Sequence, residues 1–284
     1  MKLNVIKVNP VDNMTIFVMD RLEPSNHIKI ANKLMEYGNV HGEQVGFIEE
    51  PITAKGKSLN TLRLQMMGGE FCGNATRSLA ALIVHLNLPM VNKTEDLYNV
   101  ILEVSGINEL LECTVRKTEI ENSYFSKVQM PLPKSVVNSA FQFYNKMISY
   151  IRVDFPGITH FIVESKDIKD KEGFFKAIKD YTDQEELDAI GIMFYDSITS
   201  FLTPLVYVRS TDSLYWERSC ASGTSALGVA LALRRNSSLH EYIKQPGGEL
   251  EVVVKLENDK VNSLYLDGSV KIVFEGIAYI DDKL

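Results

Sequence analysis

Apolar and polar residues alternate along most of this chain, which is the pattern of half-buried β-strands. Before the middle of the chain it predicts strands near the N-terminus (1–8) and at Asn13–Asp20, Gln44–Glu49, Thr61–Met67, Asn99–Ser105, Leu110–Lys117 and Tyr124–Met130. Beyond the middle it predicts strands at Ser149–Val153, Thr159–Glu164, Ala189–Tyr195, Phe201–Arg209, Ser213–Trp216, Glu249–Leu256, Val261–Leu266 and Ser269–Phe274. We therefore expect mostly antiparallel sheets.

Two segments are apolar on nearly every side and predict buried helices. The first runs from Leu79 to Leu88 and the second from Ala226 to Leu233. Two other segments have a single apolar side and predict surface helices. One follows Ser25, the expected N-cap, and the other is Lys166–Ile178.

The sequence Pro131-Leu132-Pro133-Lys134 interrupts the strand pattern and predicts a domain boundary. We expect a first domain over residues 1–130, joined by a C-terminal strand at about 275–284, and a second over residues 131–274. Each holds one buried helix among strands. The pattern thus predicts an α+β fold of two similar domains, each a mostly antiparallel sheet wrapped around a central helix.

Composition removes several classes of function. With 284 residues, 45% of them hydrophobic, the chain is long enough for two domains with sizeable cores. Its net charge of −7 argues against nucleic acid or an anionic membrane surface as a partner. No apolar run is long enough to span a membrane, and the N-terminus lacks a secretory apolar core. We predict a cytoplasmic protein whose three cysteines are free thiols.

Two of these cysteines occupy copies of one local arrangement. The first copy is Glu70-Phe71-Cys72-Gly73-Asn74-Ala75-Thr76 and the second is Arg218-Ser219-Cys220-Ala221-Ser222-Gly223-Thr224. Each places a cysteine in a turn of small residues just before a buried helix. This is expected if two half-molecules face each other across a cleft and each contributes one thiol. Facing thiols would remove a proton from one side of a carbon and return one to the other, so the pattern predicts inversion of a stereocentre.

Chemistry at an amino-acid Cα suits this arrangement. A thiol at a helix N-terminus has its pKa lowered from about 8.5, and the thiols of Cys72 and Cys220 are therefore candidates for the acid and the base. The N–H groups of Gly73, Asn74, Ala221 and Ser222 would bind the substrate carboxylate. His160 and Glu217 are candidates for setting the protonation of the thiols. Cys113, within an alternating strand, is expected to be structural.

At these residues the chain resembles the diaminopimelate epimerase family of cofactor-independent amino-acid racemases. The family pairs a Cys-Gly-Asn-Gly-Ala-Arg-like motif with a later Cys-Gly-Ser-Gly-like motif, and here the two stand as Cys72-Gly73-Asn74-Ala75-Thr76-Arg77 and Cys220-Ala221-Ser222-Gly223-Thr224. Further similar positions are Asn13, Gln44, His160, Glu217 and Pro246-Gly247-Gly248. The resemblance implies two domains related by a pseudo-twofold axis, no cofactor, Asn13 and Gln44 as substrate-binding residues, and often a homodimer.

Departures from that family bear on the substrate. Asparagines that hold the far end of diaminopimelate in the epimerase correspond here to Ile158 and Ala189. A second charged amino-acid head would stay unpaired beside them, which is costly. The loop from Glu217 to Cys220 is also shorter than in the family, so Arg218 is not expected to take the role of the family's arginine.

A closer resemblance is to the histidine racemases of bacterial opine-metallophore synthesis. It rests on uncommon strings around the predicted cleft: Asn9-Pro10, Asn13-Met14-Thr15, Glu43 to Glu49, Glu70 to Thr76, Trp216-Glu217, Ser219-Cys220, Ser222-Gly223-Thr224 and Gln245-Pro246-Gly247-Gly248. Arg218 and Ala221 depart from this subgroup. Glu43, Glu49 and Glu70 all lie near the predicted site in the sequence, and none of them is singled out as the partner of an imidazole.

The leading prediction is a cofactor-independent racemase that interconverts L-histidine and D-histidine by proton transfer at Cα. Two alternatives share this mechanism but act on a different substrate: a diaminopimelate epimerase and a racemase of another amino acid. A thiol redox protein using Cys72 and Cys220 and a non-catalytic binder of amino acids are alternatives of other classes. Metal catalysis is disfavoured, because the five histidines show no paired ligand spacing.

Overall fold

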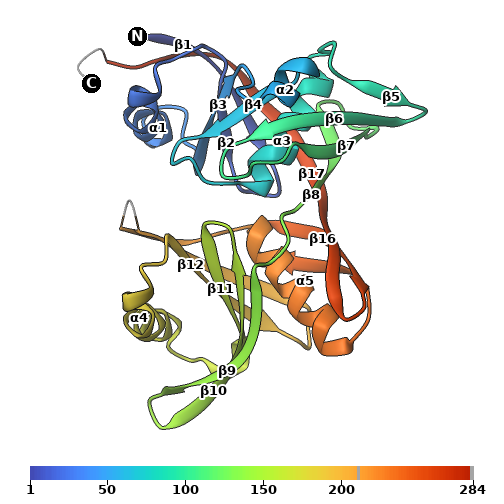
Figure 1. The fold of residues 1–284 in the computed structure, drawn as a ribbon. Coiled ribbons are helices and arrows are strands. Elements are labelled where there is room, and N and C mark those ends of the chain that lie inside the picture. The colour runs from blue at the N-terminus through green and yellow to red at the C-terminus, as the bar shows by residue number, and fades with distance from the viewer. Residues whose placement is uncertain (210–211, 282–284) are drawn as a thin grey trace. The chain divides into compact units, whose positions relative to one another are not determined.

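The computed structural model describes residues 1–209 and 212–281, which form two compact units (Figure 1). Unit 1 contains Met1–Gln129 and the chain from Asp267 onward, and unit 2 contains Met130–Leu266. Both mix helices with largely antiparallel strands, so the predicted α+β class is confirmed. The part of the expected C-terminal strand at 282–284 lies outside the described residues.

Unit 1 is built from strands β1 to β8, the later part of β17, and three helices. The strands are β1 (Lys2–Asn9), β2 (Thr15–Val18), β3 (Gln44–Glu49), β4 (Leu62–Met66), β5 (Asn92–Thr94), β6 (Leu97–Val104), β7 (Leu111–Lys117), β8 (Ser123–Gln129) and β17 (Lys260–Tyr279). The helices are α1 (His27–Met35), α2 (Ala54–Ser58) and α3 (Gly73–His85), and Pro24–Asn26 forms a 3-10 turn. The pairs β2–β3 and β4–β6 are parallel, and the antiparallel pairs include β1–β17, β1–β2, β3–β4, β5–β6, β6–β7 and β7–β8.

Unit 2 is built from β9 to β16, the first part of β17, and two helices. The strands are β9 (Ser135–Phe143), β10 (Lys146–Phe155), β11 (Ile158–Glu164), β12 (Ala189–Asp196), β13 (Phe201–Val208), β14 (Ser213–Trp216), β15 (Leu239–Gln245) and β16 (Gly248–Glu257). The helices are α4 (Lys171–Tyr181) and α5 (Ala221–Arg235), with 3-10 turns at Ser165–Asp167 and Asp183–Glu185. Here β11–β12 and β13–β15 are the parallel pairs.

Helices α3 and α5 are buried, as their all-round apolar sequences predict. In α3 every residue from Gly73 to Val84 is buried, and the helix packs on β2, β6, β7 and β8. In α5 most residues are buried, and the helix packs on β10, β11, β12, β15 and β16. The surrounding sheet of each unit thereby holds the first turn of its central helix in a fixed place.

The surface helices begin later than the sequence predicts. Ser25 lies in a 3-10 turn, and α1 starts after Asn26, whose side chain makes no capping hydrogen bond. The predicted helix at Lys166–Ile178 is split, because Ser165–Asp167 is a 3-10 turn and Asp170 caps α4 by accepting the N–H of Gly173. The cap at Asp170 thus marks the start of α4, whereas α1 begins where the 3-10 turn at Pro24–Asn26 ends.

The chain between 267 and 274 groups with unit 1 and not with the second domain expected from the sequence. Strand β17 is continuous through this stretch, where two separate strands were expected, and it pairs with β1 through Val8 opposite Ile272 and Asn9 opposite Lys271. This antiparallel pairing ties the residues to unit 1. Strands β5, β9 and β15 and helix α2 are further elements that the alternation did not predict.

A buried carboxylate fixes the loop before α2. Glu103 on β6 is 2% exposed and accepts hydrogen bonds from the N–H groups of Ile52 and Thr53 and from the Thr53 hydroxyl, at 2.6 to 3.1 Å. It also pairs with Arg63 of β4 at 2.9 Å. Burial opposes ionisation of Glu103, but these hydrogen bonds lower its pKa from 4.5 to about 2.

The substitution Glu103→Gln is expected to lower the free energy of unfolding by about 1–3 kcal/mol at neutral pH, because charge-assisted bonds are lost at a buried site. The native side chain stays ionised to about pH 2, whereas in the unfolded chain it protonates near pH 4.5. The contribution of the Glu103 carboxylate to the free energy of unfolding is therefore full above pH 4.5 and is lost as the pH falls toward 2. Thermal unfolding at several pH values measures this. The exposed Glu112→Gln on β7 is the matched control, and equal effects of the two would contradict the account.

Candidate active site

Cys72 caps the N-terminus of α3. Its backbone is extended, with φ −128° and ψ 110°, and its Sγ accepts a hydrogen bond from the N–H of Ala75 at 3.4 Å. Its carbonyl oxygen accepts from both the N–H and the hydroxyl of Thr76, at 2.9 and 2.8 Å. The thiol is therefore held at the positive end of a buried helix dipole.

Cys220 caps α5 in the same way. Its backbone has φ −118° and ψ 110°, and its Sγ accepts from the N–H of Gly223 at 3.3 Å. Its carbonyl oxygen accepts from the N–H and the hydroxyl of Thr224, at 3.0 and 2.7 Å. A Cβ at Gly223 would approach the end of the Met193 side chain closer than real Cβ atoms come, so a larger residue there would displace Met193. The two cysteine motifs thus form one capping geometry twice.

Polar side chains gather around Cys72 in unit 1. The Cys72 thiol donates to Gln44 Oε1 at 3.0 Å, and Gln44 Nε2 donates to Asn13 Oδ1 at 2.7 Å. Asn74 Nδ2 donates to the same Asn13 oxygen at 3.1 Å. Three candidate substrate-binding residues, Asn13, Gln44 and Asn74, are therefore joined to Cys72 in one network.

Arg77 extends this network and was not among the candidate residues. It is 0% exposed, and its Nε donates to Asn74 Oδ1 at 3.1 Å while Nη1 donates to the Ser269 carbonyl oxygen at 3.0 Å. Burial lowers the pKa of the guanidinium from 12.5 to about 10, and the nearby charges of Asp267 and Cys72 oppose that change. The signal in the sequence was a charged residue five positions after Cys72, just before the apolar segment that begins at Leu79.

Cys220, in unit 2, is more deeply buried than Cys72. Gln245 accepts a hydrogen bond from the N–H of Cys220 at 2.8 Å and donates one to the Thr224 hydroxyl at 2.9 Å. It therefore holds the first turn of α5 in place. Ser222 Oγ lies 3.6 Å from the sulfur. Burial raises the pKa of the Cys220 thiol well above 9.0, and the charge of Glu217 and a hydrogen bond with it raise the pKa further. The thiol form is thus strongly favoured in this environment.

The remaining candidate residues fall into two groups. The backbone of Gly73 and Asn74 forms the first turn of α3, and that of Ala221 and Ser222 forms the first turn of α5, where helical N–H groups lack helical acceptors. Arg218 contacts the predicted turn at Pro246, with its backbone carbonyl accepting the N–H of Gly247 at 2.7 Å. Its cation therefore lies beside the turn between β15 and β16.

His160 on β11 is fully buried, and neither ring nitrogen has a hydrogen-bond partner among the residues that the structure describes. Burial lowers its pKa from 6.5 to about 3, so the ring is neutral at physiological pH. It lies beside Gly191 of the parallel neighbour β12 and in edge contact with Phe155. Within unit 2, Cys220 and Glu217 come together, whereas His160 does not hydrogen-bond the thiol.

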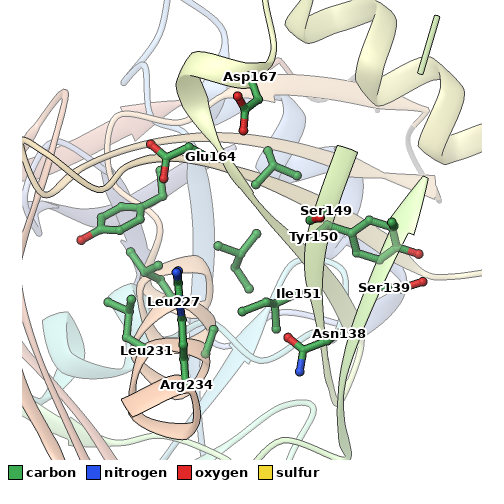
Figure 2. A pocket seen from close by; sticks show the side chains of 15 residues that line it. Asn138, Ser139, Ser149, Tyr150, Ile151, Glu164, Asp167, Leu227, Leu231 and Arg234 are labelled. Atoms are coloured by element: carbon green, nitrogen blue, oxygen red, sulfur yellow. The ribbon is translucent and has the colours of Figure 1, made fainter. Parts of the chain in front are cut away.

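A cavity of about 720 Å³ in unit 2 lies away from the capped turn. It is lined by residues of β9 to β12 and by Leu227, Leu231 and Arg234 from the later turns of α5 (Figure 2). Neither Cys220 nor another candidate residue is among its lining residues. The described residues contain no group of three or more His, Cys, Asp or Glu side chains placed to hold a metal. Within the same described part of the chain, no helix is both long and apolar enough to cross a membrane.

The chain matches, over residues 2–279, the family model described as the histidine racemase CntK N-terminal domain. It belongs to this family. A histidine racemase of Fusobacterium nucleatum subsp. nucleatum is 36% identical over 281 residues, covering 98% of this chain and 97% of the relative. One from Staphylococcus aureus is 32% identical, with 97% of each chain covered. The resemblance to histidine racemases seen in the sequence is confirmed.

Solved structures show the same fold. A probable proline racemase from Agrobacterium radiobacter K84 matches with a TM-score of 0.68 and 11% identity, covering 99% of this chain and 93% of that one. A hydroxyproline epimerase from Agrobacterium vitis also matches with a TM-score of 0.68, at 10% identity, covering 99% and 94%. The architecture is therefore that of proline racemase-type proteins.

The packing of His160 against Gly191 is open to test. A Cβ at position 191 would approach His160 Nδ1 closer than real Cβ atoms come. We expect Gly191→Ala to lower the free energy of unfolding by about 1–3 kcal/mol through overpacking. His160→Ala in the same chain should recover part of this loss, giving a coupling of about 1 kcal/mol in a double-mutant cycle by urea unfolding. Gly38→Ala, where the methyl meets nothing within 4 Å, is the control. Additive losses at 160 and 191 would contradict the contact.

Proposed function

We propose that this protein interconverts L-histidine and D-histidine by direct proton transfer at Cα, without a cofactor. Membership of the histidine racemase family supports the reaction and the substrate. The observation that carries the mechanism is the repeated capping geometry, which places a thiol at the start of two buried helices. Cys72 and Cys220 are the proposed catalytic residues.

In the proposed reaction one cysteine acts as thiolate and the other as thiol. The thiolate takes the α-proton and becomes a thiol, while the electron pair stays on the substrate as an enolate-like carbanion. The second thiol gives its proton to the opposite face of Cα and becomes a thiolate. The product has inverted configuration, and the two sulfurs have exchanged roles, which suits catalysis of both directions.

The charge that develops on the substrate carboxylate needs donors. We propose that the backbone N–H groups at the first turns of α3 and α5 supply them, through Gly73 and Asn74 and through Ala221 and Ser222. The small residues Gly73, Ala221 and Ser222 support this assignment, because they let a ligand approach the backbone closely. Asn13 and Gln44 are proposed to contact the amino acid from the network around Cys72.

Glu217 and His160 are proposed to govern protonation. Glu217 hydrogen-bonds the Cys220 thiol, so it is placed to accept the thiol proton when Cys220 serves as base. His160 has a buried, neutral ring, and we propose that its ring nitrogens gain a hydrogen-bond partner only when substrate is bound.

The finer architecture is part of this proposal. We propose that units 1 and 2 are two racemase halves related as in diaminopimelate epimerase, one carrying Cys72 and the other Cys220. The repeated order of elements supports it: α1 joins the parallel pair β2–β3 in unit 1, and α4 joins the parallel pair β11–β12 in unit 2. We also propose a homodimer, and a cytoplasmic location in which both catalytic thiols stay reduced.

Replacing either catalytic cysteine is expected to lower the rate of L-histidine racemisation by about 10²–10⁴-fold, because each supplies an acid or base that a serine hydroxyl does not replace. Cys113→Ser is the matched control. Cys113 is buried in β7, and burial, with the charge of Glu112, raises the pKa of its thiol to about 12. Chiral chromatography of the products measures the rates. Near-normal turnover in both Cys72→Ser and Cys220→Ser would refute the two-thiol mechanism.

The substrate is tested separately with a panel of amino acids. Ile158 and Ala189 begin the adjacent parallel strands β11 and β12, and neither side chain offers a partner for a second charged head. We expect kcat/KM for L-histidine to exceed that for diaminopimelate by at least about 10²-fold. A preference for diaminopimelate or for another amino acid would keep the mechanism and replace the substrate.

A further inference from the structure

The amide groups around Cys72 are oriented by the residues at the two ends of their chain. An amide has a donor end and an acceptor end, and either can face a given neighbour unless that neighbour has only one capacity. A guanidinium only donates, and an ionised carboxylate only accepts. The network has one of each at its ends, Arg77 and Glu43.

Arg77 fixes the first amide. Its Nε donates to Asn74 at 3.1 Å, so the Asn74 atom facing it must be the oxygen. The Asn74 nitrogen then faces Asn13, and it donates to Asn13 Oδ1 at 3.1 Å. The carbonyl of Ser269 accepts from Nη1 of the same guanidinium at 3.0 Å, which holds Arg77 in place.

Glu43 fixes the second amide independently. Its carboxylate accepts from Asn13 Nδ2 at 2.8 Å, so the Asn13 nitrogen must face Glu43. The Asn13 oxygen then faces Asn74 and Gln44, which is the orientation that Arg77 also requires. The two ends of the network agree.

Gln44 is oriented by two acceptors. Its Nε2 donates to Asn13 Oδ1 at 2.7 Å and to Thr15 Oγ1 at 2.8 Å. The Thr15 hydroxyl donates to the Asn13 carbonyl oxygen at 3.2 Å, which leaves its lone pairs to accept from Gln44. Gln44 therefore presents its oxygen to Cys72, 3.0 Å from the sulfur. A carbonyl oxygen binds a thiol and repels a thiolate.

We propose that Glu43 and Arg77 are positioning residues, which fix the direction of the amide chain so that Gln44 holds Cys72 as a protonated thiol before substrate binds. On the proposed function, Cys72 then begins as the proton donor to Cα. Cys220, after passing its proton to Glu217, begins as the base. The resting enzyme is therefore set for the enantiomer whose α-hydrogen faces Cys220.

Other groups near Cys72 act in the opposite direction. The charge of Arg77 and the N–H of Ala75 favour a thiolate. The carboxylate of Asp267, which pairs with Arg116 at 2.9 Å, offsets part of the Arg77 charge. Glu70, two residues before Cys72, has its pKa raised by burial. If substrate draws the Gln44 amide away, the acceptor is lost while Arg77 and Ala75 remain. The same thiol then becomes a better proton donor.

The test measures the protonation of Cys72 without histidine. In a Cys113→Ser, Cys220→Ser parent, Cys72 is the only thiol, and iodoacetamide reacts with its thiolate. The pH dependence of alkylation, followed by mass spectrometry, gives the midpoint for Cys72. We expect a midpoint above pH 7 in this parent. Because Arg77 also orients Asn13 through Asn74, the parent carries Asn74→Ala as well. In that parent Glu43→Gln removes the remaining obligate acceptor, and alkylation at pH 7 should be about tenfold faster, equivalent to one pKa unit.

Two further variants separate orientation from charge. Thr15→Val removes one acceptor of Gln44 Nε2 and changes no charge, so it should also speed alkylation, by a smaller factor. Glu49→Gln makes the same charge change at the far end of β3, where the carboxylate faces Arg63 and His27, and should leave the rate within twofold of the parent.

Three results would overturn the proposal: a parent midpoint below pH 7, an effect of Glu43→Gln no larger than that of Glu49→Gln, or no effect of Thr15→Val. Far-UV circular dichroism confirms that each variant is folded. Because no turnover is measured, failure of the wild-type protein to racemise histidine would remove the proposed function and leave this result standing.

Discussion

The structure depends on one interaction made twice: a cysteine sulfur accepts the N–H of the residue three positions later and so caps a buried helix. Cys72 does this for α3 and Cys220 for α5. The cap fixes the sulfur at the end of the helix where unsatisfied N–H groups and the helix dipole favour negative charge. Sheets that bury both helices hold these ends in place, and a threonine four residues on ties down each cysteine carbonyl.

Around this shared geometry the two thiols have different surroundings. Cys72 is half-buried and faces an amide network that ends in Arg77 and Glu43. Cys220 is buried beside Glu217, and both features favour its thiol form. A reaction that takes a proton at one sulfur and gives one at the other needs two groups that differ in protonation. In our account Gln44 keeps Cys72 as a thiol, whereas Cys220 becomes the base by passing its proton to Glu217, so the difference comes from neighbouring side chains and not from the caps themselves.

The parts of the site that the sequence predicted are those set by local chemistry. A cysteine among small residues just before an all-apolar segment is a local signal for a capped, buried helix, and both helices are present. They begin directly after the cysteines, at Gly73 and Ala221, and so include the small residues expected in the turn. Arg77 and Gln245 were missed as site residues because their roles arise from contacts across the fold. Arg77 reaches Ser269, 192 positions away, and Gln245 reaches the N–H of Cys220 from the end of β15.

In the fold, too, the features set by local sequence were predicted, and those set by contacts between distant residues were missed. The α+β class followed from alternation and two apolar helices. Strand β9 was missed because most of its residues are exposed and give no alternating signal. The membership of 267–274 in unit 1 was missed because it depends on the pairing of β17 with β1, at opposite ends of the sequence. Ser25 was expected as a cap on its residue type alone, yet the turn at Pro24–Asn26 moves the start of α1 past it.

The central claim is that two groups, one on each face of Cα, exchange the proton. The measurement that tests it most directly is the reaction of L-histidine in D2O with the reduced protein and no added cofactor. At low conversion, NMR and chiral chromatography would report deuterium in each enantiomer. The account predicts D-histidine with deuterium at Cα and remaining L-histidine that keeps its hydrogen. Equal deuterium in both enantiomers from the start would contradict it, because a single base would then serve both faces.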